Sequence, residues 1–79
     1  MDTFTRRTAI AVQAAIEAAG QTQLGVAEES GIPRTTLIRR LRGLSAFTVA
    51  ELEAIAAVLG TTVSNLLAAA EQADAEASA

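Results

Sequence analysis

An all-α fold of five short helices is what this 79-residue sequence predicts. Large apolar residues recur at helical spacing in five segments. Threonines stand where most of these segments begin, and glycines stand where several of them end, as expected of helix caps. Thr48 and Glu51 form a capping box, which is the clearest local signal for a helix start. The length suits one small domain.

The first helix is expected over residues 5 to 19, with Gly20 ending it. One face carries residues at helical spacing: Ala9, Val12, Ile16 and Ala19. Thr5 can cap its start. Arg6 and Arg7 lie in the first turn, where they oppose the helix dipole. Either they contact an anionic partner such as phosphate, or they are an ordinary solvated helix start.

Two shorter helices are expected over residues 23 to 30 and 34 to 42, joined by a tight turn. Thr22 can cap the first of them, and Gly31 supplies the permissive backbone of the turn. Pro33 suits the start of the next helix, where a missing N–H costs nothing. Val26 is expected to face the core, with Leu37 and Leu41 on the buried side of the later helix. Two short helices joined in this way form a helix-turn-helix, whose second helix enters the major groove of DNA.

Four arginines crowd the second helix of this pair, and no acidic residue lies between Pro33 and Gly43. A charge cluster on a short helix is often only a solvated face. Like charges at helical spacing destabilise the helix, however, and an anionic partner relieves the repulsion. The cluster therefore favours DNA as the partner: Arg34, Arg39, Arg40 and Arg42.

A fourth helix is expected to begin at Thr48, with Phe47 stapled onto Leu52 and Gly60 at its end. Its buried stripe comprises Leu52, Ile55, Ala56 and Leu59. Thr62 is expected to cap a fifth helix through Val63, Leu66, Leu67 and Ala70. From Glu71 on, no large apolar residue remains, and we expect residues 71–79 to be an acidic, alanine-rich tail that is frayed or disordered. Residues 1–70 then form the domain.

The amino-acid composition argues against several kinds of site and function. The chain has neither histidine nor cysteine, so we expect no zinc site, no disulfide and no cofactor. It also lacks tyrosine and a phosphate-binding glycine loop, and we expect it not to be an enzyme. No apolar run approaches the roughly 20 residues that span a bilayer, so we expect a cytoplasmic protein. The net charge of −3 opposes DNA binding by the chain as a whole. The basic residues are concentrated, however, because none lies after Gly43, and such a concentrated patch can still attract DNA.

The order and residues of these helices resemble the lambda-repressor-like family, which includes Cro proteins and xenobiotic-response-element-type regulators. The matching features are Thr22-Gln23, Ala27, Gly31-Ile32, Arg34-Thr35-Thr36-Leu37, Arg42-Gly43, Phe47-Thr48, Glu51-Leu52 and Leu59-Gly60. The similarity covers roughly residues 8 to 68. The run PRTTLIRRLRG resembles the recognition helices of repressors from temperate actinobacterial phages.

This resemblance implies a compact five-helix DNA-binding domain with the helix-turn-helix as its second and third helices. It implies base contacts from Arg34, Thr35, Ile38 and Arg39. Phosphate contacts are expected from Gln23, Thr36, Arg40 and Arg42, with Arg6 and Arg7 as further candidates. Two residues depart from the family pattern: Ser30 replaces an apolar residue, and Arg40 replaces a buried aliphatic one. Since an unpaired buried charge is costly, a slight rotation of this helix would bring Leu41 to the buried position and turn Arg40 outward, so the orientation of Arg40 stays open.

The function expected is sequence-specific binding of double-stranded DNA as a transcriptional regulator, such as a phage repressor or Cro-like protein. The alternative is a helical protein-interaction module, such as an antitoxin, with secondary DNA binding. We expect a monomer or a weak homodimer through the fifth helix, using Leu66, Leu67 and Ala70. When bound to DNA, the protein would be associated with the bacterial nucleoid.

Overall fold

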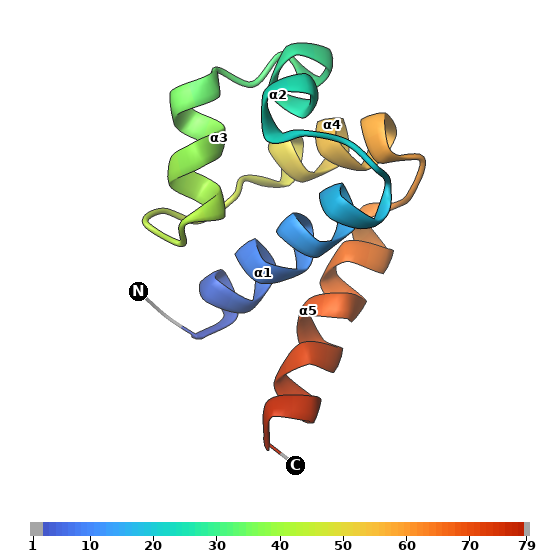
Figure 1. The fold of residues 1–79 in the computed structure, drawn as a ribbon. Helices are drawn as coiled ribbons and strands as arrows, with labels where there is room; N and C mark the ends of the chain where they lie inside the picture. Colours follow the sequence, from blue (N-terminus) through green and yellow to red (C-terminus); the bar gives the residue numbers. More distant parts are fainter. Residues whose placement is uncertain (1–2, 79) are drawn as a thin grey trace.

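Five α-helices make up the fold in a computed structural model that describes the backbone of residues 3–78 and the side chains of residues 3–72. The helices are α1 Thr3–Ala18, α2 Gln23–Ser30, α3 Arg34–Leu41, α4 Val49–Leu59 and α5 Val63–Ser78. No strand occurs within residues 3–78, so the all-α fold class is confirmed. In Figure 1, α1 lies between α3 at one edge of the molecule and α5 at the other.

The core takes side chains from every helix and is built mostly from medium-sized residues. Its most deeply buried large side chains are Val12, Ile16, Val26, Leu37 and Ile55. Leu52, Ala56 and Leu66 join them, while Leu41, Phe47 and Leu59 pack against this cluster half-buried. The expected core positions of α1 to α4 are thus largely confirmed, and Leu37 is the fully buried core residue of α3.

The first helix differs from expectation at both ends. It begins at Thr3, two residues early, so Thr5 lies inside the helix and is not its cap. It ends at Ala18, and the chain turns through Gly20, whose φ of 70° is left-handed. Ala19 therefore lies beyond the helix and is exposed, so it does not continue the face formed by Ala9, Val12 and Ile16 as expected.

The fifth helix is longer than the sequence indicates. Thr62 accepts a hydrogen bond from the backbone N–H of Asn65 at 3.1 Å, as a cap would, and the helix continues past Glu71 to Ser78. Alanine and glutamate are strong helix formers, which explains why the backbone of residues 71–78 is helical. Residue 79 lies outside the described residues. Leu66 and Ala70 are buried in the monomer's own core, so of the three residues expected at a dimer interface only Leu67 retains exposed surface.

Local hydrogen bonds cap both ends of α2 and stabilise the turn that leads to α3. Thr22 caps α2 by accepting from the Gly25 N–H at 3.0 Å. At the other end, Gly31 adopts a φ of 79° and donates its N–H to the carbonyl of Ala27. The Ser30 hydroxyl accepts from the Ile32 N–H at 3.3 Å, and the Ile32 side chain is buried. Ser30 thus stabilises the turn directly, and the buried Ile32 anchors the turn to the core.

The end of α3 is a Schellman motif. The N–H of Gly43 bonds to the carbonyl of Arg40 and that of Leu44 to the carbonyl of Arg39, at 3.0 and 3.1 Å. Gly43 has a φ of 74°, and a Cβ there would lie 3.6 Å from the Cγ of Arg6. The motif therefore ends α3 at Leu41, with Arg42 as its C-cap, and brings this end against the first turn of α1.

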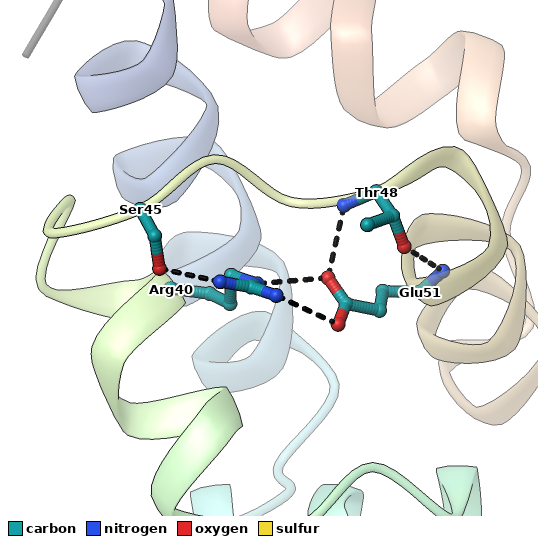
Figure 2. A network of polar contacts seen from close by, with 4 residues as sticks. All are labelled: Arg40, Ser45, Thr48 and Glu51. Atoms are coloured by element: carbon teal, nitrogen blue, oxygen red, sulfur yellow. Dashed lines mark hydrogen bonds and ion pairs between the residues drawn. The ribbon is translucent and has the colours of Figure 1, made fainter.

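Arg40 links α3 to the start of α4 (Figure 2). Its Nε and Nη2 donate to the two carboxylate oxygens of Glu51 at 2.9 and 3.3 Å, and Nη1 donates to the hydroxyl of Ser45. Glu51 also completes the capping box: it accepts from the Thr48 N–H at 2.9 Å, while its own N–H donates to the Thr48 hydroxyl at 3.1 Å. The side chains of Arg40 and Glu51 are only 21% and 17% exposed. Arg40 therefore turns towards α4, because a carboxylate already oriented by the capping box lies within its reach.

This pairing shifts the pKa of Glu51. Partial burial by itself raises the pKa of the carboxyl group. The hydrogen bond from Arg40, that from the Thr48 backbone and the positive charge of Arg40 outweigh this effect, so the net pKa of Glu51 is lowered. The carboxylate therefore stays charged down to a lower pH than an exposed glutamate does.

Within the described part of the chain, no single helix is long and apolar enough to cross a bilayer. One pair of described segments, α4 and Val63–Gln72, is long and apolar enough when the two are taken together. These two segments meet at a bend of 99°.

Replacing Leu52 with alanine tests the core. Leu52 is 5% exposed, and the cavity left behind should lower the free energy of unfolding by about 2–5 kcal/mol. Thermal denaturation followed by circular dichroism should show a fall of many degrees, since about 1 kcal/mol shifts so small a domain by roughly 4–8 °C. Val49→Ala is the matched control, because Val49 lies on the same helix but is 67% exposed. A melting temperature of Leu52→Ala within a degree or two of wild type would contradict this core assignment.

Replacing Glu51 with glutamine tests the ion pair, because glutamine can still accept in a capping box but carries no charge. Leaving the partly buried Arg40 without its carboxylate should lower the free energy of unfolding at pH 7 by about 1–3 kcal/mol. The lowered folded-state pKa of Glu51 means that the pair stabilises the protein fully above the unfolded pKa of about 4.3. That stabilisation is lost as the pH falls through the folded-state pKa.

Urea denaturation at a series of pH values measures both effects. Wild type should lose more stability than Glu51→Gln on acidification below about pH 4. Glu53→Gln, which changes an exposed carboxylate on the same helix, should stay within about 0.5 kcal/mol of wild type. Equal acid sensitivity in wild type and Glu51→Gln would show that the pair does not stabilise the fold.

Candidate nucleic-acid interface

The outward surface of α3 carries most of the residues that the sequence assigns to DNA. Arg34, Thr35 and Arg39 are exposed, as is Arg42 directly after the helix. Thr35, Arg39 and Arg42 share a face, because they follow one another by four and three residues. Thr36 and Ile38 are half-buried at the edges of this surface. The inward side of α3 is held by Leu37, so these side chains project from a helix that is anchored to the core.

A cleft of about 210 Å³ separates the start of α2 from α3. It is lined by Gln23, Leu24, Arg34, Leu37 and Ile38. The structure thus brings Gln23 close to two of the expected base-contacting residues, although they lie on different helices.

Two hydrogen bonds in series tie the Gln23 amide to α1. Its Nε2 donates to the Oε1 of Gln13 on α1 at 2.9 Å, and Gln13 Nε2 donates to a carboxylate oxygen of Glu17 at 3.2 Å. A carboxylate only accepts, so it orients the Gln13 amide, which in turn orients Gln23. Gln23 therefore keeps its Oε1 and one N–H for another partner.

A second cleft, of about 250 Å³, lies at the far end of α3. Arg6 and Arg42 both line it, together with Ala9, Ile10, Leu41 and Gly43. Two arginine residues from distant parts of the sequence thus line one cleft, because the Schellman turn at Gly43 packs against Arg6. Such an arrangement suits a phosphate group.

Arg7 and Arg40 do not share the setting of the other arginines. The guanidinium of Arg7 lies over the ring of Phe4, 5.2 Å from its centroid, and Arg7 is half-buried. Arg40 is bound to Glu51 and Ser45. Adjacent residues in the sequence, such as Arg6 and Arg7, point to different surroundings because helical neighbours lie about 100° apart.

Three residues of this region were not identified from the sequence. Leu24 is 47% exposed at the mouth of the first cleft, Gln13 holds Gln23, and Glu51 neutralises Arg40. The capping box did mark Glu51 as a helix start, but nothing in its spacing from Arg40 signals a pair eleven residues apart. Within the described residues, no group of three or more acidic side chains could hold a metal ion.

Comparison with protein families found a match to helix-turn-helix proteins over residues 12–66, which is well over half of the chain. Comparisons with curated proteins and with solved structures gave no match. The matched residues include α2, the turn at Gly31 and α3, together with the ion pair that ties α3 to α4. The chain therefore belongs to the lambda-repressor/Cro-like helix-turn-helix family of DNA-binding transcription regulators.

Proposed function

We propose that the protein is a sequence-specific regulator that inserts α3 into the major groove of double-stranded DNA. The observation that carries this proposal is the surface of α3, where Arg34, Arg39 and Arg42 are all exposed on a helix anchored from below by Leu37. Three like charges so close together repel one another, and phosphates or guanine edges relieve that repulsion.

The positions of these side chains suggest a division of work. Arg34, Thr35, Ile38 and Arg39 face the bases in this proposal. Phosphate contacts come from the two ends of the surface, with Gln23 and Thr36 at one end and Arg6 and Arg42 at the other. The bound cation Arg40 contributes by positioning α3, and Arg7 is engaged with Phe4.

Electrostatics is compatible with this proposal although the net charge is −3. All six arginines precede Leu44, and five of the nine acidic residues follow it. Screening limits the reach of each charge to about 8–10 Å at ordinary ionic strength. DNA approaching α3 therefore meets a local positive potential, and binding should weaken steeply with salt.

The role as a repressor or Cro-like protein of an actinobacterial phage rests on the resemblance of the α3 sequence. Pairing of two copies on adjacent half-sites would supply the specificity that one short helix lacks. Because Leu66 and Ala70 are buried, a contact through α5 would use Leu67, together with Phe4 and Val49, which are exposed and line one cleft with it. In the cell this activity belongs to the cytoplasm, with the protein on the nucleoid when bound.

A gel-shift titration against the DNA that flanks the protein's own gene tests the proposal. We expect a shift at low salt that survives an excess of random competitor DNA. A shift that random DNA abolishes would indicate unspecific binding, and no shift even at low salt would favour the antitoxin-like alternative. A random duplex library, enriched on the protein through several rounds, supplies a target if the flanking DNA holds none.

Arg34→Ala should reduce specificity. Arg34 lies at the N-terminal end of α3, where its guanidinium can donate two hydrogen bonds to the O6 and N7 of guanine. The loss on the target duplex should be about 1–3 kcal/mol, with a much smaller loss on random DNA. Arg34→Lys is the charge-preserving control, and it should also lose specificity because an ammonium group lacks the paired geometry. Equal weakening on both DNAs would place Arg34 on phosphate.

Arg42→Ala should weaken target and random DNA alike, because Arg42 lies beside Arg6 at the far end of α3. The slope of log affinity against log salt should fall by about one in magnitude. Arg42→Lys should restore the slope, since a point charge suffices for phosphate. If Arg42→Ala altered base preference and Arg34→Ala did not, α3 would lie in the groove in the opposite direction.

A further inference from the structure

The cleft between α2 and α3 is lined by both polar and aliphatic side chains, and the charge contacts proposed above do not use the aliphatic ones. Arg34 is exposed at one side, and Leu24 and Ile38 offer aliphatic surface beside it. Leu24 is 47% exposed, and its aliphatic side chain lines the cleft together with Ile38 and Arg34. Leu37, 1% exposed, also lines the cleft, and its position there is set by the core.

We propose that this cleft receives the 5-methyl group of a pyrimidine that lies next to the guanine read by Arg34. The inference rests on the proposed function, since it requires α3 to lie in the major groove. In that groove, the C5-methyl of thymine is the only apolar group among the base edges, and aliphatic side chains recognise it by contact. Arg34 and Ile38 are four residues apart, so they face the same side of α3 and meet neighbouring base pairs.

The size of the cleft agrees with such a guest. Its volume of about 210 Å³ compares with the roughly 10–15 Å³ that a cavity needs to hold one water molecule. A methyl group, with part of its pyrimidine edge, can therefore enter without displacing the core side chain Leu37. Water that now covers Leu24 and Ile38 would be released, which is the source of the binding free energy.

Gln23 lines the same cleft but is held at its margin. Its amide is hydrogen-bonded to Gln13 at 2.9 Å, and Gln13 is bonded to Glu17. The Gln23 side chain is thus tied towards α1, and the apolar part of the cleft is left to Leu24 and Ile38. The free N–H of Gln23 is available for the phosphate or base edge beside the methyl group.

Removing single methyl groups from the DNA tests this inference without altering any base pair. A duplex enriched from a random library on the full chain is resynthesised with deoxyuridine in place of each thymidine in turn. Each cytosine is likewise replaced by 5-methylcytosine. Affinities are measured at fixed salt for wild type, Ile38→Ala, Ile38→Val and Leu24→Ala. Ile10→Ala is the matched control, since Ile10 is exposed on α1 and lines the other cleft.

For wild type, we expect one pyrimidine in each half-site, beside a guanine, at which the methyl group strengthens binding about fourfold. This factor corresponds to the roughly 0.8 kcal/mol of one buried methyl-sized group. The ratio of the affinities with and without the methyl group should fall towards one in Ile38→Ala and Leu24→Ala. In Ile38→Val this ratio should lie between one and the wild-type value. Ile10→Ala should keep the full factor. Melting curves and binding to random DNA at low salt show whether each variant is folded, and Ile38→Val preserves the test if Ile38→Ala unfolds.

Two results overturn the inference and are distinguishable from a failure of the proposed function. One is an enriched duplex at which no methyl group changes the affinity. The other is a methyl effect that persists undiminished in folded Ile38 and Leu24 variants. If no duplex is enriched at all, sequence-specific binding itself is contradicted, and the inference falls with it.

Discussion

The contact between Arg40 and Glu51 decides how α3 is presented. A helix of eight residues is too short to be stable alone, so its direction depends on its attachments. Leu37 anchors α3 from below, the turn at Gly31 and Ile32 sets where it starts, and the pair with Glu51 ties its last turn to the start of α4. Because Glu51 is also part of the α4 cap, a single carboxylate serves two helices. The exposed arginines of α3 are thereby carried on a helix that is held at both ends.

The six arginines differ in role although the sequence presents them as one basic cluster and one basic pair. Arg34 and Arg39 are exposed on α3, Arg42 and Arg6 meet at its far end, Arg40 is bound to Glu51, and Arg7 lies over Phe4. A positive charge can serve DNA only where its surroundings leave the guanidinium exposed. The number of arginines in the sequence is therefore larger than the number available to DNA. In addition, Arg6 of α1 lines the same cleft as Arg42, which no local sequence pattern indicates.

The abundance of alanine has consequences for both the core and the ends of the chain. Ala9, Ala27, Ala56 and Ala70 are all buried, so helices approach closely and a few larger side chains suffice to fill the space between them. The same preference for alanine extends α5 to Ser78, because helix propensity persists where apolar side chains have ended. Burial of Leu66 and Ala70 against the rest of the domain also explains why α5 offers less surface to a second copy than its sequence implies.

The sequence by itself determined the elements whose signals are local. Caps at Thr22, Thr48 and Thr62, the glycine turns at Gly31 and Gly43, and the spacing of Leu37, Leu52 and Ile55 all depend on residues within one or two helical turns. These signals were sufficient for the fold class and for locating the helix-turn-helix. Only the tertiary structure decided the partner of Arg40, the meeting of Arg6 with Arg42, the hold of Gln13 on Gln23 and the cleft beside Leu24. Each of these joins different helices, and the rotation of one helix against another is set by the packing of the whole core, which no short stretch of sequence encodes.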